Sequence, residues 1–166
     1  MKRSRFAAVV GAAVLGLSTL AACAEDEPAA PEDSPDAAEF ALSTADVGDF
    51  GSVVVDGSGR TLYVFDNDTA DPPKSNCDGD CATAWPPVEA GSGTPELDGI
   101  NAALVGTVER TDGSQQLTLN GWPLYRFAKD AEAGEAKGQA VNDVWWVIGA
   151  DGKKITTKAP ATTGGY

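Results

Sequence analysis

One seven-residue stretch occurs twice in this chain in nearly the same form. Residues 62–68 read LYVFDND and residues 124–130 read LYRFAKD, so Tyr, Phe and Asp recur at the same spacing. A repeat of this kind indicates that one structural unit is used twice. Any fold for this chain must therefore accommodate two related halves.

The residues around each copy predict a β-hairpin. Residues 52–56 and 61–65 flank a Gly-Ser-Gly turn, and residues 116–119 and 123–127 flank Asn120-Gly121, one of the strongest short hairpin signals. Turns at 111–114 and 149–152 predict two further hairpins. We therefore predict a mainly β fold: a small antiparallel domain over residues 50–157, with repeat one over about 50–90 and repeat two over about 104–157.

One or two short helical turns complete this prediction. Asp80 has the side chain of a helix N-cap, and a helix from there would end at Pro86-Pro87 after Trp85. Residues 131–138 are a second candidate for a helical turn. The Gly- and Pro-rich residues 89–101 are interpreted as the connection between the two halves.

The repeated residues are interpreted as structural parts, with a ligand site as the alternative. Tyr63 and Phe65 share one face of their strand, as do Tyr125 and Phe127, and we expect this face to point inward. Asp68 and Asp130 each follow the strand. A carboxylate at such a position accepts backbone N–H groups or a nearby tyrosine hydroxyl.

The N-terminal segment has the features of an export signal. Residues 1–5 are basic, residues 6–20 are apolar, and Leu20-Ala21-Ala22 precede Cys23. This ending resembles the lipobox of bacterial lipoproteins, which implies that residues 1–22 are removed and that Cys23 carries the acyl chains, palmitate among them. The alternative is an ordinary secretory signal. The lipobox implies a protein anchored by lipid to the cell membrane and facing its extracytoplasmic side.

The remaining ends of the chain are predicted to lie outside the fold. After Cys23, residues up to 49 are rich in Ala, Pro, Glu and Asp and predict a disordered acidic spacer, and residues 158–166 predict a flexible tail. Loss of the three cations of the signal changes the net charge from −13 to −16. Such a charge disfavours nucleic acid and anionic lipid surfaces as partners. We expect a monomer that contacts the membrane only through its anchor.

Several motifs together resemble one bacterial family. They are the lipobox, both Tyr-x-Phe-x-x-Asp copies, a Cys-x-x-x-Cys followed by Trp-Pro-Pro, and Asn-Gly-Trp-Pro-Leu-Tyr. The family is that of predicted lipoproteins with a Tyr-x-(Phe/Trp/Tyr)-x-x-Asp motif, also described as secreted repeats of unknown function and common in high-GC Gram-positive bacteria. The resemblance covers nearly the whole folded region, and it implies no particular activity.

Cys77 and Cys81 are predicted to form a disulfide. They are an even pair once Cys23 is lipidated, and an exported chain meets an oxidising compartment. A redox-active pair is an alternative, which the neighbouring Asp78 and Asp80 oppose because they repel a thiolate. A copper-type metal site is a further alternative, but the chain has no histidine and its one methionine is the first residue.

Other candidate sites are weak. The loop that begins at Asp66 starts like a calcium-binding EF-hand, but its sixth position is Asp71 and its twelfth is Cys77, which favours a solvated turn over a weak calcium site. The sequence holds no nucleophile elbow, phosphate loop or dinucleotide fingerprint. The tryptophans are assigned to the core rather than to a carbohydrate platform, with one of Trp145 and Trp146 expected at the surface.

These observations favour a non-enzymatic surface binding or interaction module. We expect no cofactor and no bound metal, and the sequence does not identify a protein or small-molecule partner. The alternative function is a thiol-redox or copper-handling protein centred on Cys77 and Cys81.

Overall fold

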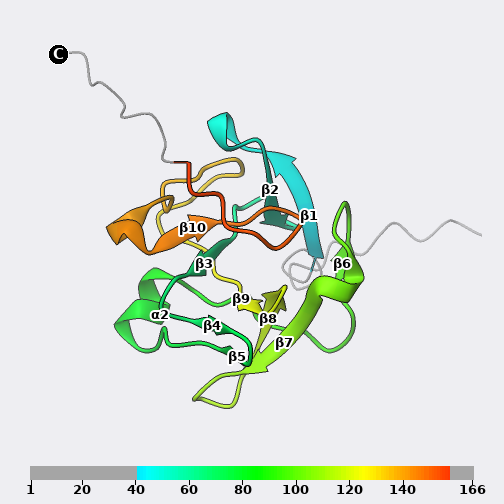
Figure 1. Ribbon diagram of the computed structural model, residues 1–166, viewed down its shortest axis with the longest axis vertical. Helices are drawn as coiled ribbons and strands as arrows, with labels where there is room; N and C mark the ends of the chain where they lie inside the picture. Colours follow the sequence, from blue (N-terminus) through cyan, green and yellow to red (C-terminus); the bar gives the residue numbers. More distant parts are fainter. Residues whose placement is uncertain (1–40, 158–166) are drawn as a thin grey trace, which may run out of the picture. The chain divides into compact units, whose positions relative to one another are not determined.

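The computed structural model describes residues 41–157, and Figure 1 shows how the elements of this segment are arranged. The predicted signal peptide, Cys23 and the tail lie outside the described residues. No helix within residues 41–157 has the length and apolar character needed to cross a membrane. The elements are β1 (Ala41–Asp46), η1 (Gly48–Phe50), β2 (Ser52–Asp56), β3 (Tyr63–Phe65), β4 (Thr69–Ala70), β5 (Pro73–Lys74), α2 (Asp80–Ala84), β6 (Glu96–Leu97), η2 (Ala102–Leu104), β7 (Val105–Glu109), β8 (Gln115–Leu119), β9 (Trp122–Pro123), η3 (Val141–Asp143) and β10 (Trp145–Val147).

The mainly β fold predicted from the sequence is confirmed. The strands form two three-stranded sheets, with the orders β2-β1-β6 and β7-β8-β9, and two two-stranded ladders, β10-β3 and β4-β5. All four predicted hairpins are present. In two of them strands pair, β7 with β8 and β8 with β9. In the other two, single antiparallel bridges join Val55 of β2 to Thr61 and Ile148 to Lys154.

The Asn-Gly turn between β8 and β9 has the backbone that the sequence predicts. Asn120 and Gly121 have φ angles of +50° and +80°, as both central residues of a type I′ turn require. The glycine has a second role, because a Cβ atom at position 121 would lie 2.2 Å from the carbonyl oxygen of Ala70. A larger residue would therefore push β4 away from this turn.

The predicted spacer is wrong over residues 41–49, because the described fold begins at Ala41. β1 pairs antiparallel with β2 along its whole length, from Leu42 opposite Asp56 to Asp46 opposite Ser52. β6 pairs with the other edge of β1 in parallel. Leu42 is the only large apolar residue of the strand and its only fully buried one, so its Ala- and Asp-containing sequence resembles the composition of the residues before it.

The two sequence repeats complete each other's sheets. β10, at the end of the second repeat, pairs antiparallel with β3 of the first, with Trp146 opposite Val64. Residues 86–88, at the end of the first repeat, bond in the same way to the motif strand of the second, and the N–H of Val88 donates to the carbonyl of Leu124 at 2.9 Å. Each half of the fold therefore contains an end segment of the other repeat, β10 in one case and residues 86–88 in the other.

The two motif strands meet at their tyrosines. The N–H of Tyr63 donates to the carbonyl of Tyr125, and the N–H of Tyr125 donates to the carbonyl of Tyr63, both at 2.9 Å. This antiparallel bridge lies where the halves join and relates the two copies of the motif to each other as an approximate twofold pair.

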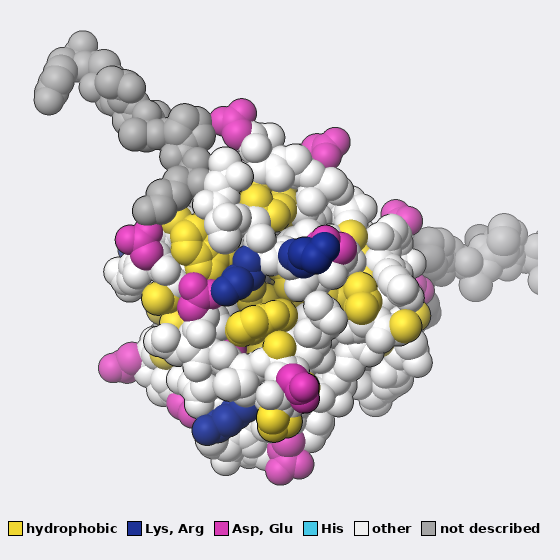
Figure 2. Space-filling view, viewed as in Figure 1, with side chains coloured by type: hydrophobic (Ala, Val, Ile, Leu, Met, Phe, Trp, Pro, Cys, Tyr) yellow, Lys and Arg dark blue, Asp and Glu magenta, His cyan; other side chains and the backbone are white. Residues whose placement is uncertain are grey.

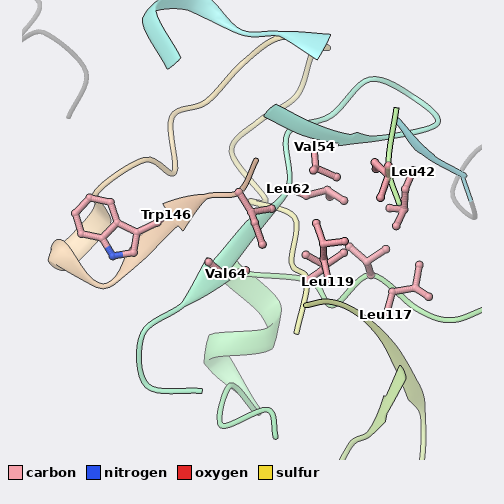
Figure 3. Close-up of a cluster of buried hydrophobic side chains, with 11 residues drawn as sticks. Leu42, Val54, Leu62, Val64, Leu117, Leu119 and Trp146 are labelled. Atoms are coloured by element: carbon pink, nitrogen blue, oxygen red, sulfur yellow. The ribbon is translucent and has the colours of Figure 1, made fainter. Parts of the chain in front are cut away.

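Buried side chains form two clusters on opposite faces of the motif strands. The predicted inward aromatic face belongs to one cluster, and the face that carries Leu62, Val64 and Leu124 is also fully buried. Figure 3 shows the aliphatic cluster around Leu62 and Leu119. The aromatic cluster consists of Val47, Val53, Val55, Tyr63, Phe65, Cys77, Trp85, Tyr125, Trp145 and Val147.

The helical predictions are partly correct. α2 forms where a helix was expected, but Gly79 occupies its N-cap position and makes no side-chain cap, so Asp80 is the first helical residue and not the cap. Residues 131–138 contain turns and no helix. These residues instead form the loop that follows Asp130, and the backbone N–H of Lys137 in this loop donates to the Asp130 carboxylate.

Candidate functional site at the paired tyrosines

The motif tyrosines and aspartates pair across the two repeats. The hydroxyl of Tyr63 donates to Asp130 at 2.5 Å, and the hydroxyl of Tyr125 donates to Asp68 at 2.7 Å. Each tyrosine is completely buried and each aspartate nearly so. The sequence predicted a tyrosine hydroxyl as one partner for these carboxylates, and the structure places that tyrosine in the other copy of the motif.

The second oxygen of each motif carboxylate closes a loop. Asp68 accepts the backbone N–H of Asn76 at 2.7 Å, and Asp130 accepts that of Lys137 at 3.0 Å. Each of these bonds holds the chain that follows the motif. The predicted loop-closing role is therefore present together with the tyrosine bond, and both oxygens of both aspartates are used.

Burial changes the acid–base properties of these groups. It raises the pKa of Asp68 to about 6, against the opposing effect of the hydrogen bond from Tyr125. It also raises the pKa of Asp130. Burial, reinforced by the adjacent carboxylates, raises the pKa of both Tyr63 and Tyr125 above the ordinary tyrosine value. Both hydroxyls therefore stay protonated donors, which is unsuited to a catalytic phenolate.

The aromatic rings of the two repeats form a stack beside the tyrosines. Trp85 and Trp145 lie parallel with centroids 3.8 Å apart, and Phe127 and Phe65 stack on their outer faces at 4.2 Å. Tyr63 contacts Trp85 edge-on, and Tyr125 contacts Trp145 in the same way. Offset and edge contacts of this kind add stability beyond buried area.

The expectation that one of Trp145 and Trp146 lies at the surface is wrong. Both are buried, Trp145 in the aromatic stack and Trp146 in the aliphatic cluster on the other face. The indole N–H of Trp146 donates to the carboxylate of Asp66 at 2.9 Å. Neighbouring residues do point in opposite directions, but both faces of β10 are covered. Trp85 is buried as well, and Trp122 is partly exposed.

Arg110 is a buried residue that the sequence reasoning missed. Its buried guanidinium donates to the hydroxyl of Ser75 at 2.9 Å, to the side chain of Gln116 at 2.7 Å and to the carbonyl of Cys77 at 2.7 Å. Ser75 also bonds to the hydroxyl of Tyr125. The network therefore connects one tyrosine–aspartate pair to the cysteine loop. Sequence pattern gave no signal for it, because an arginine that follows an exposed strand is ordinarily at the surface.

The disulfide is formed as predicted. Cys77 and Cys81 are bonded, with Cα atoms 5.2 Å apart, and Cys77 is fully buried. Gly79 between them has a φ of +56°, a conformation that suits glycine and lets so short a loop close. We call residues 71–84 the clipped loop. Most of its residues are exposed. The disulfide and the hydrogen bond from Arg110 to the carbonyl of Cys77 fix its position on the buried side.

The aspartates of the suspected calcium loop bind protein groups instead. Asp66 accepts the indole of Trp146 and pairs with the ammonium of Lys154 at 2.5 Å, and Asp68 is engaged by Tyr125. Within residues 41–157, no group of three or more His, Cys, Asp or Glu side chains is arranged to hold a metal ion.

Comparison with known proteins identifies the repeat but not an activity. Residues 44–89 and 106–149, together more than half of the chain, match the model of a family described as "Secreted repeat of unknown function". No curated protein and no solved structure matches. The two matched segments correspond to the two halves whose end strands are exchanged in the fold.

Proposed function

Because the chain belongs to the family of secreted repeats of unknown function, we propose that it is a non-enzymatic binding module of the cell surface. In this proposal a lipid on Cys23 holds it at the extracytoplasmic side of the membrane. The observation that carries the proposal is the burial of the repeated motif. The side chains of Tyr63, Tyr125, Asp68 and Asp130 are buried and hydrogen-bonded to one another or to backbone, which supports a scaffold role for them.

The clipped loop is the surface that we assign to the partner. It belongs to the part of the first repeat that the second repeat does not copy. Lys74 and Asp80 on it are exposed, while the loop is fixed by the disulfide and by the bond from Arg110 to the carbonyl of Cys77. A surface held rigid before binding loses less conformational entropy when a partner binds. We expect the partner to be a protein outside the membrane.

Site-specific photocross-linking in intact cells tests this assignment. A photoreactive phenylalanine analogue replaces Lys74 in the clipped loop, or Lys153 in the turn before the C-terminal end of the fold, where the side chain is 79% exposed. We expect a cross-linked product of one defined mass from position 74 and none from position 153. Absence of a product at position 74, or the same products at both positions, would contradict the proposal.

The anchor and the absence of catalysis are tested separately. Cys23→Ala removes the acylated thiol, so the chain is expected to leave the membrane fraction, whereas membrane retention would argue against a lipid anchor at Cys23. Turnover of any small molecule by the purified protein, abolished by one substitution, would rule out a purely binding role.

A further inference from the structure

A cavity of about 290 Å³ lies away from the paired tyrosines and from the clipped loop. One wall is the face of the β7–β8 hairpin that carries Val105, Thr107 and Leu117, where Thr107 lies opposite Leu117 in the strand register. The other wall is the connection between the repeats, including Ala90, Pro95, Leu97 and Ala102. Figure 1 shows β6 and β7, which contribute to these two walls, on the same side of the domain.

The lining has an unusual composition for this protein. Charged residues make up 22% of the sequence, yet none of the twelve described residues that line the cavity is charged. Figure 2 shows acidic and basic side chains spread over the visible face of the domain. Thr94, Thr107 and Gln115 supply uncharged polar groups. Such a site disfavours ions and suits an apolar ligand with at most one uncharged hydrogen-bonding group.

The size of the cavity limits the ligand further. Its volume lies at the lower end of the range of about 300–1,000 Å³ that is typical of small-molecule pockets. It therefore suits a small apolar group, such as a short stretch of hydrocarbon chain or the end of a longer one.

The path of the chain indicates where such a ligand comes from. β1 enters the described fold next to β6, with Ala41 opposite Glu96 and Leu42 opposite Leu97, and Leu97 lines the cavity. Cys23 precedes Ala41 by eighteen residues, which can span at most about 60 Å when extended. The cavity therefore lies beside the point where a lipid-bearing tether would join the domain.

We propose that this cavity binds the end of one hydrocarbon chain of a membrane lipid. The choice of source rests on the anchor of the proposed function, but the binding site itself does not. The uncharged walls bind the methylene groups because binding removes apolar surface from water. Thr107, at the exposed rim, is placed to contact the polar end of the ligand.

Titration with 1-decanol tests the site without any anchor. The full chain carrying Cys23→Ala is titrated and followed by methyl NMR. We expect binding that saturates within the aqueous solubility of 1-decanol, with shifts at Val105, Leu117 and Leu97. Thr107→Asp, which places a charge at the rim, should weaken binding at least tenfold, and Thr107→Val should retain it. Thr157→Asp adds the same charge at an exposed position that does not line the cavity, and should change nothing.

The outcomes separate the site from the anchor. Absence of saturable binding by a chain whose NMR spectrum shows it to be folded, or equal binding by the Thr107→Asp variant, would overturn the proposal whatever the state of Cys23. Shifts of the cavity methyl groups in the lipidated protein without decanol or vesicles would contradict a membrane lipid as the source. Shifts that appear when zwitterionic phosphatidylcholine vesicles are added to the Cys23→Ala chain would support a membrane lipid as the source. Failure of Cys23 to be acylated would contradict the anchor alone.

Discussion

A buried tyrosine hydroxyl needs an acceptor, and each motif tyrosine finds one in the other repeat. Leaving such a hydroxyl unpaired costs about 1–3 kcal/mol, and Tyr63 and Tyr125 are both fully buried. The motif spacing thus places each aspartate just past its own strand, where it closes a local loop and receives the hydroxyl of the other copy. The repeated residues are therefore explained by folding, and a ligand is not needed to account for them.

The stability of the protein should depend on the titration of Asp68. Its folded pKa of about 6 lies above the value near 3.9 expected in an unfolded chain. The contribution of this group to stability is therefore complete below about pH 4 and is lost as the pH rises through about 6. Urea unfolding of the wild type and of Asp68→Asn at pH 4 and at pH 7 measures this effect. We expect the unfolding free energy of the wild type, relative to that of the variant, to fall by about 1–3 kcal/mol from pH 4 to pH 7.

Asp56 provides a control of opposite sign. Burial opposes its ionisation, but hydrogen bonds from Arg126, Ser58 and the backbone of Arg60 outweigh this and lower its pKa. Its contribution to stability is therefore lost as the pH falls, so the advantage of the wild type over Asp56→Asn should grow with rising pH. If the two variants showed the same slope of stability against pH, the opposite pKa shifts of Asp56 and Asp68 would be contradicted.

The exposed elements of the first repeat depend on buried anchors. The clipped loop contains α2, and a five-residue helix has little stability of its own. The disulfide fixes the start of α2, and the buried guanidinium of Arg110 donates a hydrogen bond to the carbonyl of Cys77. Trp85 at the end of α2 enters the aromatic stack. The loop is thus held at three points although most of its surface faces solvent.

Removal of the disulfide should weaken the domain without unfolding it. Chain-entropy arguments for so short a loop give about 2 kcal/mol, so Cys77→Ala/Cys81→Ala should lower the unfolding free energy by about that amount in urea titrations. Reductant should have the same effect on the wild type and none on the double variant. Complete unfolding on reduction, or no change, would contradict this account. A reduction potential well above about −300 mV would favour the thiol-redox function instead.

At the scale of the whole molecule, the two repeats form one intertwined domain. The end segment of each repeat bonds to the motif strand of the other. The stacked rings come alternately from the two repeats, in the order Phe127, Trp85, Trp145 and Phe65. A sequence repeat here is therefore not a unit that folds alone. The family match, with two segments separated by a connection, has the same organisation.

Local patterns predicted the parts of this fold but not how they combine. β-branched runs and the Asn-Gly turn identify hairpins because both signals act within a few residues. The local sequence does not show that end segments are exchanged between the repeats, because residues 145–148 have the composition of a strand whichever strand they pair with. Arg110 was missed because its burial depends on acceptors more than thirty residues away. β1 was missed because Leu42 is its only large apolar residue and because its pairing with β2 and β6 depends on residues further along the chain.

Double-mutant cycles test the crossed pairing most directly. Free energies of unfolding are measured for Tyr125→Phe, Tyr63→Phe, Asp68→Asn, Asp130→Asn and the four tyrosine–aspartate double variants. Residues in contact couple by about 0.5–3 kcal/mol, whereas independent sites add within about 0.3–0.5 kcal/mol. We expect coupling of about 1 kcal/mol or more for Tyr125 with Asp68 and for Tyr63 with Asp130, and additivity for the pairs within one motif copy. Coupling within each copy, with additivity between copies, would contradict the intertwined fold.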